Sequence, residues 1–104
     1  MTSANNNQIQ EVLSGSKPVL LDFYAEWCGP CKSLAPTIDT LSEKYKDKFE
    51  ILKVDVDQHK ELAMKYGIRS IPALLFFENG AVKERLVGNQ AIQTLENKIS
   101  SYLN

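Results

Sequence analysis

Two cysteines three positions apart are the residues of this sequence best suited to chemistry. Cys28 and Cys31 enclose Gly29 and Pro30, and Trp27 precedes them. Two thiols at this spacing in the first turn of a helix can close a small disulfide ring with little backbone movement, so their pairing can be reversible. The spacing therefore predicts a dithiol that alternates between a reduced and an oxidised form.

The expected surroundings of the two sulfurs make them unequal. An apolar run over residues 19–25 ends just before Cys28, and an amphipathic pattern begins near Cys31. At the N-terminus of a helix, free backbone N–H groups and the helix dipole favour a thiolate, so we expect a lowered pKa for Cys28. Cys28 is therefore the predicted attacking sulfur. Cys31, one turn inside the helix and shielded from solvent, is the predicted resolving sulfur.

The residues between the cysteines suit this place in the fold. Pro30 fits the first helical position, where a missing N–H costs nothing, and Gly29 lets another chain approach closely. Two other interpretations of the pair are a structural disulfide and half of a zinc site. Zinc takes about four ligands, and the chain adds only His59 as a further histidine or cysteine. The strand-to-helix junction favours the redox interpretation.

Asp22 is a second candidate because it stands in the middle of an apolar strand. An unpaired carboxylate there is costly, so burial should raise its pKa and let it exchange protons near neutral pH. It could then accept the proton of Cys31 as that thiol attacks, through a water molecule. Lys53 on the next strand could bias this titration through its charge. In the alternative interpretation, Asp22 and Lys53 form a purely structural ion pair.

The first half of the chain predicts a strand–helix–strand unit around these residues. A short helix over 8–13 precedes the apolar strand over 19–25, which suits burial on both faces. Leu34, Ile38, Leu41 and Tyr45 recur at helical spacing, and a second strand follows over 51–54. Two such strands joined through a helix pair in parallel, with a right-handed crossover.

The second half predicts a hairpin between two helices. A helix over 59–66, closed by Gly67, leads to a strand over 73–77, a tight turn at Asn79-Gly80 and a charged edge strand over 82–87. A last helix spans 91–103. The predicted fold class is α/β, with a small mixed parallel and antiparallel sheet covered by helices on both faces.

Length and composition limit the class of protein. The chain has 104 residues, 43% hydrophobic and 24% charged, which predicts one folded domain over 1–104. A net charge of −1, without charged blocks, argues against nucleic acid or membrane as partner. No apolar segment reaches the roughly 20 residues of a membrane span, and the polar start predicts the cytoplasm, where ordinary thiols stay reduced.

The sequence resembles the thioredoxins from about Thr2 to the end. The matching features are the pentapeptide Trp27 to Cys31, Asp22 upstream of it, and the pairs Ile71-Pro72, Asn79-Gly80 and Val87-Gly88. The resemblance implies the thioredoxin fold and a protein-disulfide reductase. Gly29-Pro30 is similar to the dipeptide of the reductants, whereas related oxidants and isomerases usually have a histidine there.

The resemblance also implies a substrate surface and partners. Pro72 is expected after a cis peptide bond, facing the cysteines, with Ile71 offering backbone groups to an extended substrate segment. A flat docking patch is expected to comprise Trp27, Gly29, Pro30, Ile71, Pro72, Gly88 and Asn89. The implied partners are protein disulfides and a thioredoxin reductase, an NADPH-dependent flavoprotein. The chain is expected to act as a monomer and to bind no cofactor or metal.

The sequence departs from the usual thioredoxin pattern at four points. Tyr24 replaces a tryptophan, Ser70 a glycine and Ala73 a threonine, and the start of the chain leaves the first edge strand short or absent. Among the remaining residues, His59 is expected to be solvated, whereas Tyr45, Tyr66, Phe76, Phe77 and Met64 are expected in or near the core. Two other functions stay open: a binding module with incidental cysteines, and an oxidant or isomerase of the same fold.

Overall fold

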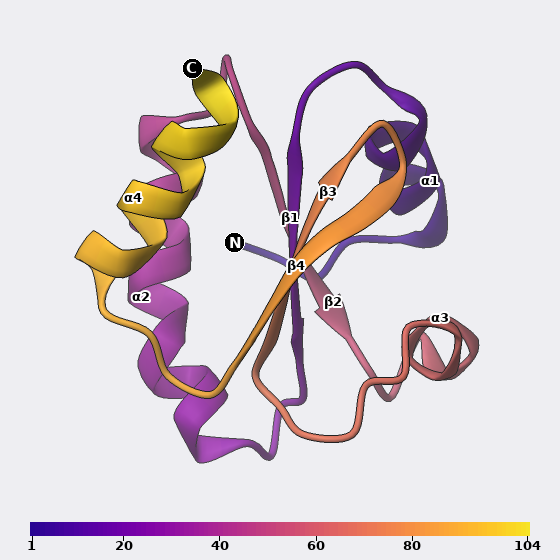
Figure 1. Ribbon diagram of the computed structural model, residues 1–104. Coiled ribbons are helices and arrows are strands. Elements are labelled where there is room, and N and C mark those ends of the chain that lie inside the picture. The colour runs from indigo at the N-terminus through magenta and orange to yellow at the C-terminus, as the bar shows by residue number, and fades with distance from the viewer.

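A central sheet separates two pairs of helices (Figure 1). The computed structural model describes all 104 residues. In chain order the elements are α1 (Asn6–Ser14), β1 (Val19–Tyr24), α2 (Gly29–Lys44), β2 (Glu50–Asp55), α3 (Lys60–Lys65), β3 (Ala73–Glu78), β4 (Ala81–Val87) and α4 (Ile92–Leu103). Their order and types confirm the sequence prediction, with boundaries shifted by one or two residues at most ends.

The sheet has the strand order β2-β1-β3-β4. β1 pairs in parallel with β2 and antiparallel with β3, and β3 pairs antiparallel with β4. All six residues of β1 are buried, as expected for a strand covered on both faces. The sheet is therefore mixed, and the strand that precedes the cysteines lies inside it.

Local sequence sets the starts of the first two helices. Asn5 caps α1 through a reciprocal capping box: its side chain accepts from the Gln8 N–H, and the Gln8 side chain accepts from the Asn5 N–H, each at 2.8 Å. Cys28 is the N-cap of α2. Pro30 therefore lies one position later than predicted, after Gly29, but its missing N–H is still among the four that a helix start leaves unpaired.

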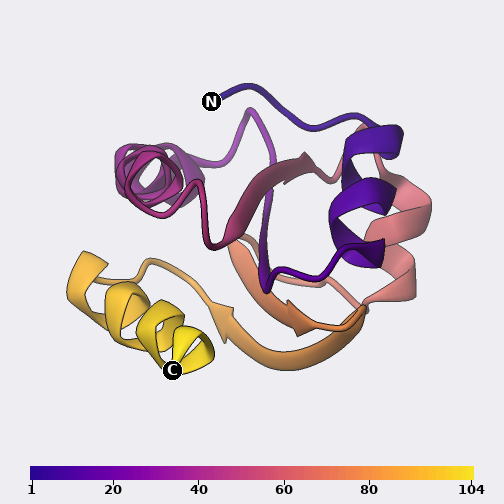
Figure 2. The ribbon, with the colours of Figure 1, turned by 90° about the horizontal axis from the view of Figure 1, so that it is seen from above.

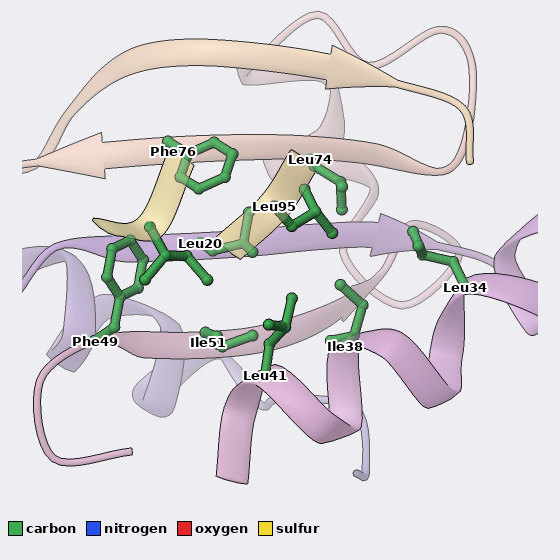
Figure 3. Packing of buried hydrophobic residues seen from close by; sticks show 10 residues of the cluster. Leu20, Leu34, Ile38, Leu41, Phe49, Ile51, Leu74, Phe76 and Leu95 are labelled. Carbon is green, nitrogen blue, oxygen red and sulfur yellow. The ribbon is translucent and has the colours of Figure 1, made fainter. Parts of the chain in front are cut away.

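Hydrophobic residues form a separate core on each face of the sheet. α2 and α4 cover one face and α1 and α3 the other, as seen along the sheet in Figure 2. The larger cluster lies under α2 and α4 (Figure 3) and comprises Leu20, Leu34, Ile38, Leu41, Phe49, Ile51, Leu74, Phe76, Leu95 and Ile99. These contacts fix α2, and with it both cysteines, against the sheet.

The turn between β3 and β4 confirms the predicted hairpin. Asn79 and Gly80 have positive φ angles of 53° and 78°, the combination that a tight type I′ turn requires. β4 then alternates between exposed and half-buried residues along the sheet edge. This alternation determines on which face of the sheet each β4 side chain lies.

The expected weak edge strand is also confirmed. Ser3 makes a single parallel bridge with Lys53, and the Ala4 N–H donates to the Lys53 carbonyl at 2.8 Å. This contact places the start of the chain beside β2. None of the four helices is long and apolar enough to cross a membrane.

Two sequence predictions about side-chain burial are wrong. Met64 is 80% exposed because α3 turns its neighbour Ala63 toward the sheet, and adjacent helical residues point about 100° apart. His59 is half-buried rather than solvated, and its Nε2 lies 2.9 Å from the Ala4 carbonyl oxygen. The cause is the N-terminal segment beside β2, which no local pattern near His59 indicates.

Candidate functional site

Cys28 and Cys31 are joined by a disulfide at the junction of β1 and α2. Their Cα atoms lie 5.3 Å apart, within the normal range for a disulfide. The buried strand β1 fixes one side of this junction and the packed helix α2 the other. The sequence prediction that these two residues form one ring is therefore confirmed.

Hydrogen bonding makes the two sulfurs different. The backbone N–H of Cys31 donates to the Sγ of Cys28 at 3.2 Å, whereas the Sγ of Cys31 accepts no hydrogen bond. Exposure does not separate them, since each residue is 5% exposed in the oxidised form. The helix N-terminus thus favours negative charge at Cys28, and shielding is common to both residues.

Asp22 is a buried carboxyl without a hydrogen-bond partner. The residue is 1% exposed, and its Oδ1 has no partner. Burial raises the pKa of Asp22 from 3.8 to about 7, and the positive charge of Lys53 opposes this rise. Asp22 shares the β1 face of Leu20, which α2 covers. It is therefore a group that can gain or lose a proton near neutral pH on the face beneath the cysteine helix.

Lys53 lies opposite Asp22 in the parallel register of β1 and β2 but forms no ion pair with it. Its Nζ lies 4.3 Å from the centre of the Tyr24 ring, at cation–π distance. The structure therefore differs from the interpretation of Asp22 and Lys53 as a structural ion pair. Lys53 acts on Asp22 only through its charge.

The Ile71-Pro72 loop lies against the cysteines. The peptide bond is cis, as the resemblance implies, Pro72 is buried and Ile71 is half-buried. The Ile71 carbonyl oxygen lies 3.8 Å from the Sγ of Cys28, which carries no proton in the disulfide. The Gly88 N–H donates to the Pro72 carbonyl at 2.8 Å, which joins a third segment to this loop. The three connections that carry these residues, between β1 and α2, between α3 and β3 and between β4 and α4, gather at the lower edge of Figure 1.

Trp27 is held on the surface by a residue that sequence reasoning missed. Its side chain is 71% exposed, and its Nε1–H donates to Asp57 Oδ2 at 3.0 Å. Asp57 is itself fixed because its backbone N–H donates to Asp55 Oδ1 at 2.8 Å. A signal was present, since Asp55 ends β2 and Asp57 follows it, at the same sheet edge as Trp27. The spacing alone did not indicate which partner they have.

The other predicted site residues differ in their contacts. A Cβ at Gly29 would meet no atom within 4 Å, so the helix start is open to an approaching chain. Gly88 has a φ of 88° and is joined to Pro72, whereas Asn89 is exposed and makes no side-chain hydrogen bond. No three His, Cys, Asp or Glu side chains lie together in a group that could hold a metal ion. Trp27, Gly29 and Pro30 thus adjoin the cysteines in sequence and Ile71 contacts the Cys28 sulfur, whereas Gly88 joins them only through Pro72 and Asn89 makes no such contact.

The fold and the site together define a class of protein. A disulfide between Cys28 and Cys31 lies at the N-terminus of a helix that follows a central strand, and a cis-proline loop packs against it. A closely spaced pair at this position exchanges electrons by thiol–disulfide exchange. The class is that of the dithiol–disulfide oxidoreductases.

Comparison with known proteins gives the family. The family model "Thioredoxin" matches residues 1–101. The chain is 44% identical over 94 residues to "Thioredoxin 1" of Synechococcus elongatus, which covers 90% of the chain and 88% of that protein. It is 45% identical over 94 residues to "Thioredoxin" of Griffithsia pacifica, covering 90% and 86%. The chain belongs to the thioredoxin family of protein-disulfide oxidoreductases, with Cys28 and Cys31 as its redox-active pair.

Two further similarities agree with this family membership. A solved structure of a mutant thioredoxin from Halobacterium salinarum NRC-1 superposes with a TM-score of 0.88 at 38% identity, covering 98% of this chain and 88% of that one. The predicted thioredoxin fold is thereby confirmed. The chain is also 44% identical over 100 residues to "Thioredoxin M-type, chloroplastic" of Pisum sativum, and the match covers 95% of the chain but only 58% of the pea protein.

Proposed function

We propose that this protein works as a reductant of disulfides in other proteins, with Cys28 as the attacking sulfur. The observation that carries this assignment is the hydrogen bond from the Cys31 N–H to the Cys28 Sγ, which favours a thiolate at Cys28. In the reduced protein, the Cys28 thiolate attacks a substrate disulfide. One substrate sulfur leaves as a thiolate, and a mixed disulfide joins Cys28 to the other.

Cys31 completes the reaction. Its thiol loses a proton, attacks the Cys28 sulfur of the mixed disulfide and releases the second substrate sulfur as a thiolate. Two electrons thus pass from the dithiol to the substrate, and the ring seen in the structure is the oxidised product.

Asp22 is the proposed acceptor of the Cys31 proton. Its pKa of about 7 makes it protonated and deprotonated in similar amounts at neutral pH, which suits a group that takes up and then releases one proton per cycle. Because Asp22 lies on the face that α2 covers, we propose that a water molecule relays the proton. Lys53 tunes this acceptor through its charge and does not bind it.

The docking patch is proposed to hold the substrate segment beside Cys28. Ile71 is only half-buried and adjoins the Cys28 sulfur, so its backbone can pair with an extended chain. The exposed Trp27 adds a large apolar surface, and its hydrogen bond to Asp57 fixes the ring.

We propose that the same patch meets a thioredoxin reductase, an NADPH-dependent flavoprotein that returns the electrons, and that one chain acts alone as a monomer. The proposed compartment is the cytoplasm, supported by thioredoxins of bacteria among the relatives.

Insulin-disulfide reduction by dithiothreitol-recycled protein tests the attacking sulfur. Cys28→Ser should abolish turnover. Cys31→Ser should also abolish it, but this variant should accumulate a mixed disulfide with the substrate that Cys28→Ser does not form. Ser33→Ala, a change in the same helical turn, should keep wild-type turnover. Turnover retained by Cys28→Ser would reject the assigned nucleophile, whereas a wild type without turnover would favour a binding module with incidental cysteines.

Equilibration with glutathione buffers tests the direction of transfer. A reductant should reach its midpoint at a potential below that of the glutathione couple, because Gly29-Pro30 places no histidine beside the attacking sulfur. A midpoint above the glutathione couple would instead assign the protein to the oxidants or isomerases.

A further inference from the structure

A small cavity of about 150 Å³ lies beside the docking patch on the face of the sheet that carries α1 and α3. The loop between α3 and β3 contributes Arg69 and Ser70, and β4 contributes Arg85 and Val87. Leu75 of β3 forms part of the lining between them. The cavity thus has an apolar base and two cationic side chains, and none of the roles proposed above uses it.

The register of the sheet explains why these residues meet. Arg85 pairs with Leu75, which belongs to the core under α1 and α3, whereas Leu86 pairs with Leu74 in the core under α2 and α4. Arg85 therefore points to the first of these faces, because neighbouring residues of a strand point to opposite sides. Arg69 reaches the same face from the loop.

The cavity continues the docking patch. Ser70 directly precedes Ile71, whose carbonyl oxygen contacts the Cys28 sulfur, and Val87 directly precedes Gly88. The hydrogen bond from Gly88 to Pro72 joins the two segments. A substrate chain extended over this junction therefore passes from the disulfide to the cavity. Val87, which is 58% exposed, gives it an apolar surface on the way.

The charge of the cavity is uncompensated. Neither Arg69 nor Arg85 forms an ion pair, both are exposed, and no carboxylate lines the cavity. The carboxylate of the neighbouring Glu84 is held on the opposite face by Lys98 and the Tyr102 hydroxyl. Guanidinium groups bind carboxylates through paired, charge-assisted hydrogen bonds, so two free guanidinium groups at one cavity favour an acidic ligand.

We propose that this cavity is a specificity subsite that binds an acidic side chain of the substrate protein. The proposal rests on the proposed reductase function and adds the chemistry of its preferred substrates. They are extended segments with Asp or Glu within about three residues of the reactive disulfide, because Ser70 lines the cavity and directly precedes Ile71, whose carbonyl oxygen contacts the Cys28 sulfur. Arg69 and Arg85 are then specificity-determining residues, with no part in the bond changes at the sulfurs.

The test uses two peptides of equal length, each with one internal disulfide. One carries Glu three residues outside each cysteine, and the matched peptide carries Gln at the same positions. Stopped-flow fluorescence of Trp27 gives the second-order rate constant for oxidation of the reduced protein, without any reductase. The Glu peptide should react about fivefold faster than the Gln peptide at low salt, as expected for two partly exposed ion pairs. The ratio should fall toward one as salt rises.

Three variants separate the two arginines from general charge. Arg69→Gln combined with Arg85→Gln should remove the preference for Glu, and Arg69→Glu combined with Arg85→Glu should reverse it in favour of a peptide with Lys at those positions. Lys83→Gln removes an exposed cation of the same strand outside the cavity and should keep the preference. An equal preference in the wild type and the double Gln variant, or the same loss in Lys83→Gln, would overturn the subsite.

A neutral substrate distinguishes failure of the subsite proposal from failure of the proposed reductase function. Bis(2-hydroxyethyl) disulfide offers no charge to the arginines, so the wild type and the double Gln variant should reduce it at equal rates. If the wild type reduces it but shows no preference for the Glu peptide, the subsite is wrong and the reductase assignment stands. If the wild type reduces neither peptide nor the neutral disulfide, the reductase assignment itself fails.

Discussion

Replacing Asp22 by Asn should make the oxidised protein more stable at pH 8 but not at pH 4. In the folded protein the pKa of Asp22 is about 7, because the carboxyl is 1% exposed and its Oδ1 has no partner. In the unfolded chain the pKa should return to the ordinary value of 3.8. Between these two values the folded state holds the proton that the unfolded chain releases.

The sign of the effect follows from this difference in proton binding. The folded protein binds more protons than the unfolded chain, so the free energy of unfolding falls as pH rises through the window from 3.8 to about 7. One pKa unit corresponds to about 1.4 kcal/mol, so the whole window amounts to about 4 kcal/mol. Asn has the shape of the protonated acid and does not titrate. The stability gained by Asp22→Asn should therefore grow from near zero at pH 4 to about 4 kcal/mol at pH 8.

Urea unfolding of the oxidised wild type and Asp22→Asn at intervals from pH 4 to pH 9 measures this gain. Asp47→Asn is the matched control, since Asp47 is exposed and forms no ion pair, and its curve should run parallel to that of the wild type. If the curves of Asp22→Asn and the wild type were parallel over the whole range, Asp22 would not hold its proton to near neutral pH. Its assignment as proton acceptor would then lose its physical basis.

Three further predictions concern the turn, the core and the surface tryptophan. Gly80→Ala should lower the free energy of unfolding by more than about 1 kcal/mol in urea, because Gly80 has a φ of 78° and a Cβ there would lie 3.2 Å from the Leu13 carbonyl oxygen. Phe49→Ala should cost about 3–5 kcal/mol, since Phe49 is 1% exposed, whereas Met64→Ala at an 80% exposed position should change stability by less than about 0.5 kcal/mol. Equal losses of stability in Phe49→Ala and Met64→Ala would contradict the described core. Asp57→Ala should shift the indole N–H proton resonance of Trp27 and speed its exchange with water, and an unmoved resonance would show that the 3.0 Å hydrogen bond does not form in solution.

Much of the site followed from patterns within short stretches of sequence. The spacing of Cys28 and Cys31 fixes their ability to pair, because one helical turn brings the two sulfurs together whatever the rest of the fold does. The apolar run around Asp22 similarly determines that this carboxyl is buried and that its pKa rises. Asn79-Gly80 specifies its turn because both residues tolerate positive φ.

Other features depended on segments that meet only in the folded chain. The burial of His59 results from the N-terminal segment beside β2, and Met64 is exposed because α3 contacts the sheet through Ala63. Asp57 is thirty residues from Trp27 in the chain, so no local pattern could indicate their hydrogen bond. Burial and partner choice depend on what packs against a residue, which local periodicity does not specify.

The sequence by itself determined the redox pair, the order of strands and helices along the chain, and the buried carboxyl, because each depends on neighbouring residues and on local backbone preferences. Only the tertiary structure decided that Lys53 lies over the Tyr24 ring instead of pairing with Asp22. It also decided that Arg69 and Arg85 share one cavity beside the docking patch. Both arrangements depend on strand register and on the direction in which each side chain leaves its strand, and these are set only when the sheet has formed.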